Sequence, residues 1–118
     1  MDIESLCDYA GSFKYVEQDF PFVDEVLVFK VGGKIFLLVS LDSYDGFNVK
    51  CDPEYALTLR ETYSGIQPGY HMNKKHWNTI NIHADVTIPL MQELIRHSYE
   101  LVFQSLTKKV KEALASAG

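Results

Sequence analysis

Side chains that can bind phosphate and unpaired bases are concentrated between Pro68 and Ile82. This stretch reads PGYHMNKKHWNTINI and combines adjacent lysines with histidines, asparagines and two aromatic residues. Lysine neutralises phosphate, asparagine and histidine donate hydrogen bonds, and aromatic rings stack on bases. Each of these residues alone is typical of a solvated loop or a packed core. Their grouping favours a surface that binds nucleic acid or another anion.

The charge of the chain is unevenly distributed. Eleven basic and sixteen acidic residues give a net charge of −5, which opposes strong nucleic-acid binding. Residues 62–84, however, contain no aspartate or glutamate, whereas residues 1–25 contain seven of them. The acid-free window therefore predicts the most positive surface of an otherwise acidic molecule.

No pattern in the chain points to catalysis or to a bound metal. The motifs G-x-S-x-G, H-E-x-x-H and the phosphate-binding P-loop do not occur. His71 and His76 are five residues apart and do not share a helical face, and Cys7 and Cys51 form no C-x-x-C pair. We therefore expect a non-catalytic protein with no metal site and no cofactor.

Hydrophobic periodicity predicts the elements that position this segment. Helices are expected over residues 2–10, from Asp52-Pro53 towards Gly65, and in a long final stretch capped by Asp85 or Thr87. Strands are expected over 25–31, 34–41, 47–51 and 77–82, with a weak one over 13–20. Gly32-Gly33 fits a tight hairpin turn, so the three central strands should form an antiparallel meander. Residues 66–75 should be irregular, and residues 113–118 should fray.

These elements predict one α+β domain over residues 1–118, with an antiparallel sheet packed against helices. The expected core comprises Phe29, Phe36, Leu38, Leu59, Leu94, Ile95, Ser98 and Val102. Trp77 should be mostly buried, and Lys74 and Lys75 exposed. The acidic N-terminus is unlike a signal peptide and the longest apolar run is far too short to span a bilayer. We therefore expect a cytoplasmic protein with no membrane association.

Two blocks of the sequence resemble the MmcQ/YjbR family. They are the run KCDPEYALTLR from Lys50 to Arg60 and the run PGYHMNKKHWNT from Pro68 to Thr79. The runs FPF from Phe20 to Phe22 and SYELV from Ser98 to Val102 fit the same pattern. The residues that match the motif are Lys50, Arg60, His71, Asn73, Lys74, His76, Trp77 and Asn78.

The resemblance implies a CyaY-like α+β fold. Family members are commonly described as predicted DNA-binding proteins with a double-wing motif, which implies nucleic-acid binding here. The same fold class includes the frataxins, which hold iron on an acidic ridge. The acids of this chain that suggest such a ridge are Asp2, Glu4, Asp8, Glu17 and Asp19, and they are sparser than a ridge requires.

Three functions remain open from the sequence. The first is non-catalytic nucleic-acid binding through Lys50, Arg60, Asn78 and the basic loop formed by His71, Asn73, Lys74, Lys75 and His76. The second is an accessory role in which the same loop binds a protein partner or a small anionic ligand. The third and weakest is cation binding at the acidic face. The sequence does not separate the first two, because they use the same residues.

Overall fold

The computed structural model describes residues 1–20, 25–69 and 72–117. Within these ranges the helices are α1 (Ile3–Gly11), α2 (Pro53–Thr62), α3 (Ile88–Ser105) and α4 (Lys108–Ala117). The strands are β1 (Val16–Asp19), β2 (Val26–Val31), β3 (Lys34–Ser40), β4 (Gly46–Lys50), β5 (Ile66–Pro68) and β6 (Trp77–Asn81). They form one antiparallel sheet in the order β1-β2-β3-β4-β6-β5. The predicted α+β fold is confirmed.

All four helices of the described ranges begin at a side chain that accepts a free backbone N–H, and at α4 the Thr107 hydroxyl accepts from Val110 at 3.2 Å. Asp2 accepts from Ser5 at 2.8 Å at the start of α1. Asp52 caps α2, and Pro53 follows at the first helical position as predicted. Of the two predicted caps for α3, Thr87 is the one used.

The central hairpin depends on two glycines. Gly32 and Gly33 have φ angles of 59° and 82°, which L-residues with a side chain rarely adopt. A Cβ on Gly32 would also lie 2.6 Å from Leu106, so the turn doubles as a packing site for the end of α3. Strands β2, β3 and β4 then pair as the predicted antiparallel meander.

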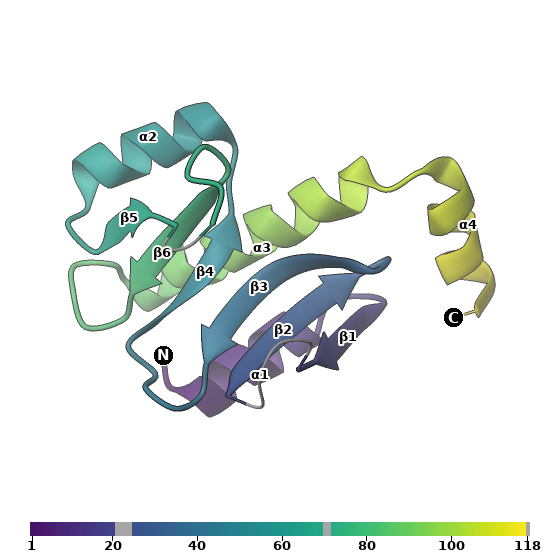
Figure 1. Cartoon of the computed structure of the whole chain (residues 1–118), viewed down its shortest axis with the longest axis horizontal. Coiled ribbons are helices and arrows are strands. Elements are labelled where there is room, and N and C mark those ends of the chain that lie inside the picture. Colours follow the sequence, from purple (N-terminus) through teal and green to yellow (C-terminus); the bar gives the residue numbers. More distant parts are fainter. Residues whose placement is uncertain (21–24, 70–71, 118) are drawn as a thin grey trace.

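The two faces of the sheet have different environments. Figure 1 shows α1 and α3 behind the strands, and the core lies between these layers. Every predicted core residue is buried except Leu38, which was assigned wrongly. Leu38 is half-buried and pairs with Val28 and Asn48, whereas its neighbours Leu37 and Val39 belong to the core.

Ser98 joins α3 to the sheet through two hydrogen bonds. Its hydroxyl donates to the Phe36 carbonyl at 2.6 Å and accepts the Lys50 N–H at 2.8 Å. Ser98 is fully buried, so both partners satisfy a polar group that would otherwise be costly in the core. This contact fixes the end of β4, where Lys50 lies.

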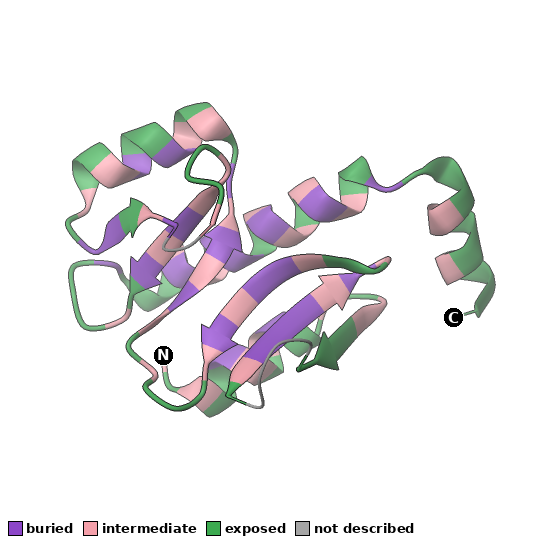
Figure 2. Cartoon of the chain, viewed as in Figure 1, coloured by how far each residue is buried: buried purple, intermediate pink, exposed green. Residues whose placement is uncertain are grey.

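Two stretches differ from the sequence prediction. Residues 66–68 form the short strand β5 on the sheet edge, not an irregular segment. Residues 108–117 form the separate helix α4, and Ala113 onwards is helical where fraying was expected. Figure 2 shows α4 as largely exposed and projecting from the body of the molecule. No helix in the described ranges is long and apolar enough to cross a membrane.

Candidate functional site

The β4–β6 pairing brings the two sequence blocks together. Lys50 at the end of β4 lies opposite Trp77 at the start of β6. Directly opposed residues of an antiparallel pair point to the same face of the sheet. Lys50 and Trp77 are both half-buried, so each keeps part of its surface accessible. Trp77 is therefore mostly buried, as predicted, without being fully enclosed.

Hydrogen bonds fold the loop between β5 and β6 tightly onto Trp77. The Asn73 carbonyl accepts the N–H groups of His76 and Trp77 at 3.2 and 3.0 Å. The Asn73 side chain accepts the Lys75 N–H at 3.0 Å, which is an Asx turn. The Gly69 N–H donates to the Trp77 carbonyl at 2.7 Å, closing the base of the loop.

Gly69 allows the two ends of the loop to approach each other. A Cβ at this position would lie 2.7 Å from the Trp77 Cβ and 3.0 Å from the Trp77 carbonyl oxygen. The turn predicted at Pro68-Gly69 was wrong, because Pro68 ends β5 and Gly69 continues the hydrogen bonding to β6 at a point where a side chain would not fit.

Arg60 holds this loop against α2. Its Nε donates to the Asn78 side-chain oxygen at 2.7 Å, and its Nη2 donates to the carbonyls of Lys74 and Trp77. Asn78 is only 1% exposed and lies opposite the core residue Val49, so its side chain is on the core side of the sheet. The sequence grouped Arg60 and Asn78 with the ligand-binding residues, whereas their contacts give them a positioning role.

The lysines are the accessible cations of the loop. Lys74 and Lys75 are exposed, as predicted. The Lys74 ammonium lies 3.3 Å from the Gly69 carbonyl. Lys50, Lys74 and Lys75 form no ion pair with any residue in the described part of the chain. The predicted ligand residue His71 lies outside the described residues.

The surroundings of His76 are less basic than the sequence window suggests. The Cys51 N–H donates to the His76 carbonyl at 2.7 Å, which brings the start of α2 beside the loop. The exposed carboxylates of Asp52 and Glu54 lie in that first turn. The acid-free stretch of sequence is therefore not an acid-free region in space.

Cys51 is a packed thiol. Burial, followed by the charge of Asp52, raises the pKa of Cys51 to about 12. The thiol therefore stays protonated at neutral pH. A cysteine that acts as a nucleophile or metal ligand must instead be a thiolate. Within residues 1–20, 25–69 and 72–117, no three His, Cys, Asp or Glu side chains are grouped so that they could hold a metal ion.

A polar surface adjoins the loop on the face of the sheet away from the core. The Thr79 hydroxyl donates to the Asn48 side-chain oxygen at 2.5 Å across β4 and β6. Beyond this pair lies a shallow hollow of about 240 Å³, lined by Ser40, Asp45, Gly46, Asn48, Thr79, Ile80 and Asn81. This surface was not predicted from the sequence, although Trp77, Thr79 and Asn81 alternate along the strand and therefore share one face.

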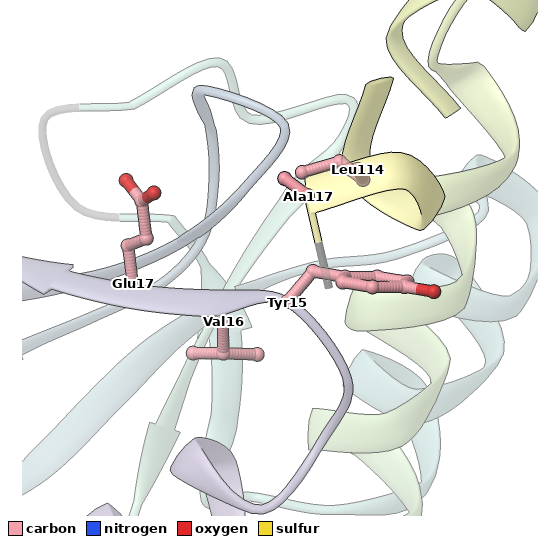
Figure 3. Close-up of a pocket in the computed structure, with 5 residues that line it drawn as sticks. All are labelled: Tyr15, Val16, Glu17, Leu114 and Ala117. Carbon is pink, nitrogen blue, oxygen red and sulfur yellow. The ribbon is translucent and has the colours of Figure 1, made fainter. Parts of the chain in front are cut away.

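A second hollow lies away from the loop, between β1 and α4. Figure 3 shows Leu114 and Ala117 of α4 above Tyr15, with Val16 and Glu17 along the strand. Its volume is about 280 Å³, and its one charged side chain is the Glu17 carboxylate. Tyr15 has a φ of 66°, an unusual conformation for a residue other than glycine. The described residues that line this hollow include no lysine or histidine, unlike the loop between β5 and β6.

Asp85, the predicted cap that α3 does not use, fixes the turn before β5. Its carboxylate accepts the N–H groups of Gly65 and Ser64 at 2.8 and 2.9 Å. These bonds lower the pKa of Asp85, since they favour the charged form. A carboxyl group whose pKa is lowered by folding stabilises the protein above its unfolded pKa. That contribution is lost as the pH falls through the folded pKa.

We therefore expect Asp85→Asn to reduce the melting temperature near neutral pH. The difference from the unmodified protein should shrink as the pH falls through the carboxyl range. Thermal melts across a pH series measure this. Asp42→Asn is the control, because Asp42 is exposed and has no hydrogen bond to its side chain in the described part of the chain. A constant difference at every pH would contradict the assignment.

The fold and the site together define an α+β protein whose basic loop lies at one end of the sheet, which carries α1 and α3 on its core face. A family model described as YjbR matches residues 11–101. The chain belongs to the YjbR family, which confirms the resemblance seen in its two sequence blocks.

Several relatives are similar over nearly the full chain. A protein of Escherichia coli O157:H7, described as uncharacterized protein YbdF, is 40% identical over 92% of this chain and 93% of its own length. Uncharacterized protein YjbR of Escherichia coli K12 is 25% identical over 97% of this chain and 98% of its own. These names carry no activity or ligand.

Solved structures match the fold. The crystal structure of the Deinococcus radiodurans protein DR2400, containing the domain DUF419, is 36% identical and superposes with a TM-score of 0.88 over 96% of this chain and 87% of that one. A Pseudomonas syringae crystal structure is 26% identical and superposes with a TM-score of 0.73 over 86% of this chain and 99% of that one.

Proposed function

We propose that this protein binds nucleic acid without catalysis, through the basic loop between β5 and β6. One observation carries the proposal: Lys50, Lys74 and Lys75 gather at one end of the sheet and have no ion pair within the described residues. The β4–β6 register places Lys50 beside Trp77, and the loop hydrogen bonds return residues 73–76 to the same tryptophan. Unpaired cations held on a fixed backbone suit phosphate groups.

The number of cations determines the affinity for nucleic acid that we expect and its dependence on salt. Three lysines, with His76 as a further hydrogen-bond donor, allow three or four phosphate contacts. Binding to a single strand should then weaken with salt at a log-log slope of about −2 to −3. A net charge of −5 opposes the approach of a polyanion. Affinity should therefore be weak at physiological salt and measurable at low salt.

The test is a double charge reversal in the loop. Lys74→Glu combined with Lys75→Glu should abolish binding of a labelled oligonucleotide, measured by fluorescence anisotropy at low salt. Both side chains are exposed, so the fold should be kept, which a thermal melt verifies. Lys108→Glu combined with Lys109→Glu is the matched control. It changes the net charge equally, on two exposed neighbouring lysines of α4.

The control separates a local site from bulk electrostatics. Equal loss of affinity in both double variants would show that only total charge matters, and the loop assignment would fail. Absence of binding by the unmodified protein at low salt would remove the nucleic-acid proposal. Binding that depends little on salt, or that inorganic phosphate displaces, would instead favour the accessory role with a protein partner or a small anionic ligand.

A further inference from the structure

The face of the sheet opposite the core carries a row of polar side chains that leads away from the loop. The register sets Lys50 opposite Trp77, Asn48 opposite Thr79, and Gly46 opposite Asn81. Residues two apart in a strand share a face. The intervening residues Phe47, Val49 and Ile80 belong to the core, which fixes the polar row on the other face.

Over β4 the helix layer lies on the core side of the sheet. Helix α3 packs on β3 and β4 through the core, and Figure 1 shows it behind these strands. Helix α2 reaches β6 through the bond from Arg60 to Asn78, and Asn78 points away from the polar row because it alternates with Trp77 and Thr79. In the polar row Asn81 is exposed and Asn48 is half-buried, so both keep accessible surface.

Between Lys50 at one end and the exposed Asp45, whose carboxylate lies 3.1 Å from His83 Nε2, at the other, the polar row offers uncharged hydrogen-bonding groups. Asn48 uses its side-chain oxygen to accept from Thr79, and its amide nitrogen has no hydrogen bond within the described ranges. The Asn81 oxygen accepts the His83 N–H at 2.7 Å, and its amide nitrogen is likewise unbonded in those ranges. Free amide donors of this kind match the acceptor atoms on the edges of bases.

We propose that this face binds the bases of a single-stranded nucleic acid whose phosphates lie on the loop. The inference rests on the function proposed above and names its substrate class. Charge complementarity selects the occupant: lysines at one end for phosphate, the Trp77 ring for stacking, and neutral amides beyond it for base edges. In a duplex the bases are already stacked and paired, so their faces cannot lie on a sheet. An unpaired strand can place successive bases on it.

The chain contains a single tryptophan, so its fluorescence reports this site alone. The experiment titrates the full chain at low salt with three probes of equal length: a single-stranded oligonucleotide, the same strand without bases, and a duplex. The intact strand should quench Trp77 and bind at least about fivefold more tightly than the abasic strand, since one stacked base contributes about that much. The duplex should bind without quenching.

A variant locates the base contact on the sheet. Asn48→Asp keeps an oxygen that accepts from Thr79 but replaces the amide donor with a carboxylate. It should reduce the preference for the intact over the abasic strand several-fold. This ratio cancels the general effect of one added negative charge. Gln104→Glu is the control, because it makes the same chemical change at an exposed position of α3 and should leave the ratio unchanged.

The outcomes distinguish the two proposals. Equal affinity for the intact and abasic strands, without quenching but with sensitivity to the Lys74 and Lys75 reversals, would overturn base binding and leave phosphate binding intact. An unchanged ratio in Asn48→Asp would also overturn it. If no probe binds at low salt, the proposed function fails and the inference fails with it.

Discussion

Replacing Ile95 with alanine should lower the free energy of unfolding by about 2–5 kcal/mol. Ile95 lies in α3, is fully buried and belongs to the core between the helices and the sheet. The substitution removes apolar contact area and leaves a cavity, because α3 packs on β2, β3 and β4 and cannot collapse onto all of them. Urea unfolding should show a lower midpoint with an unchanged slope.

Ile88→Ala provides the matched control in the same helix. Ile88 begins α3 and is 49% exposed, so the same chemical change there should cost no more than about 0.5 kcal/mol. Similar losses in the two variants would show that the buried stripe of α3 does not carry the expected share of the stability.

The helical stripe could be predicted because α3 is long and strongly periodic. Met91, Leu94, Ile95, Ser98 and Val102 recur at helical spacing and are buried, whereas Leu101, also predicted in this stripe, is half-buried. The strands β2, β3 and β4 were found for a similar reason, since turn residues separate apolar runs. In such elements the hydrophobic pattern extends over enough residues to identify the element even where single residues fit either a helix or a strand.

Hydrophobic patterning assigned Leu38 to the wrong face of the sheet. Residues 35–39 form a continuous apolar run, so no apolar–polar alternation indicates which of them face the core. The register shifts between Phe29 and Lys30, and the irregularity allows Phe36 and Leu37 to be buried in succession. Leu38 then falls on the opposite face. A bulge is set by pairing with the neighbouring strand, which a single strand sequence does not reveal.

The strand β5 and the helix α4 were missed for different reasons. The three residues of β5 are too few to show a period, and the strand exists because β6 supplies its hydrogen-bonding partner. Helix α4 has no buried residue, and its lysines were assigned to the end of the preceding helix or a short extension. Leu106 lies between the two helices with an extended backbone and ends α3.

The sequence predicted which residues of the candidate site lie on the surface but not the contacts that the others make. The adjacent lysines were correctly placed on the surface, because charged side chains in a loop rarely have another position. Arg60 and Asn78 are eighteen residues apart, and their contact follows from how α2 packs near β5 and β6. Motif spacing cannot reveal such a long-range contact, which is why a positioning pair was grouped with ligand-binding residues.

Replacing Arg60 with methionine should lower the free energy of unfolding by about 2–3 kcal/mol. The side-chain oxygen of the buried Asn78 would lose its donor, and the Asn78 nitrogen already has no partner within the described residues. Arg60→Lys should restore little of this stability, because one ammonium group cannot replace a planar guanidinium that donates to three acceptors. Arg96→Met, at an exposed position of α3, is the control and should be nearly neutral.

A double-mutant cycle separates this pair from general packing. Asn78→Leu alone should also destabilise the protein, because it leaves the Arg60 guanidinium without one acceptor. The combination with Arg60→Met should cost less than the sum, since neither side chain is then left without the other as its partner. Hydrogen exchange at the amides of His76 and Trp77 should accelerate in Arg60→Met, because the carbonyls that hold the loop lose their donor. Additive losses with unchanged exchange would contradict the positioning role and return Arg60 to the ligand-binding residues.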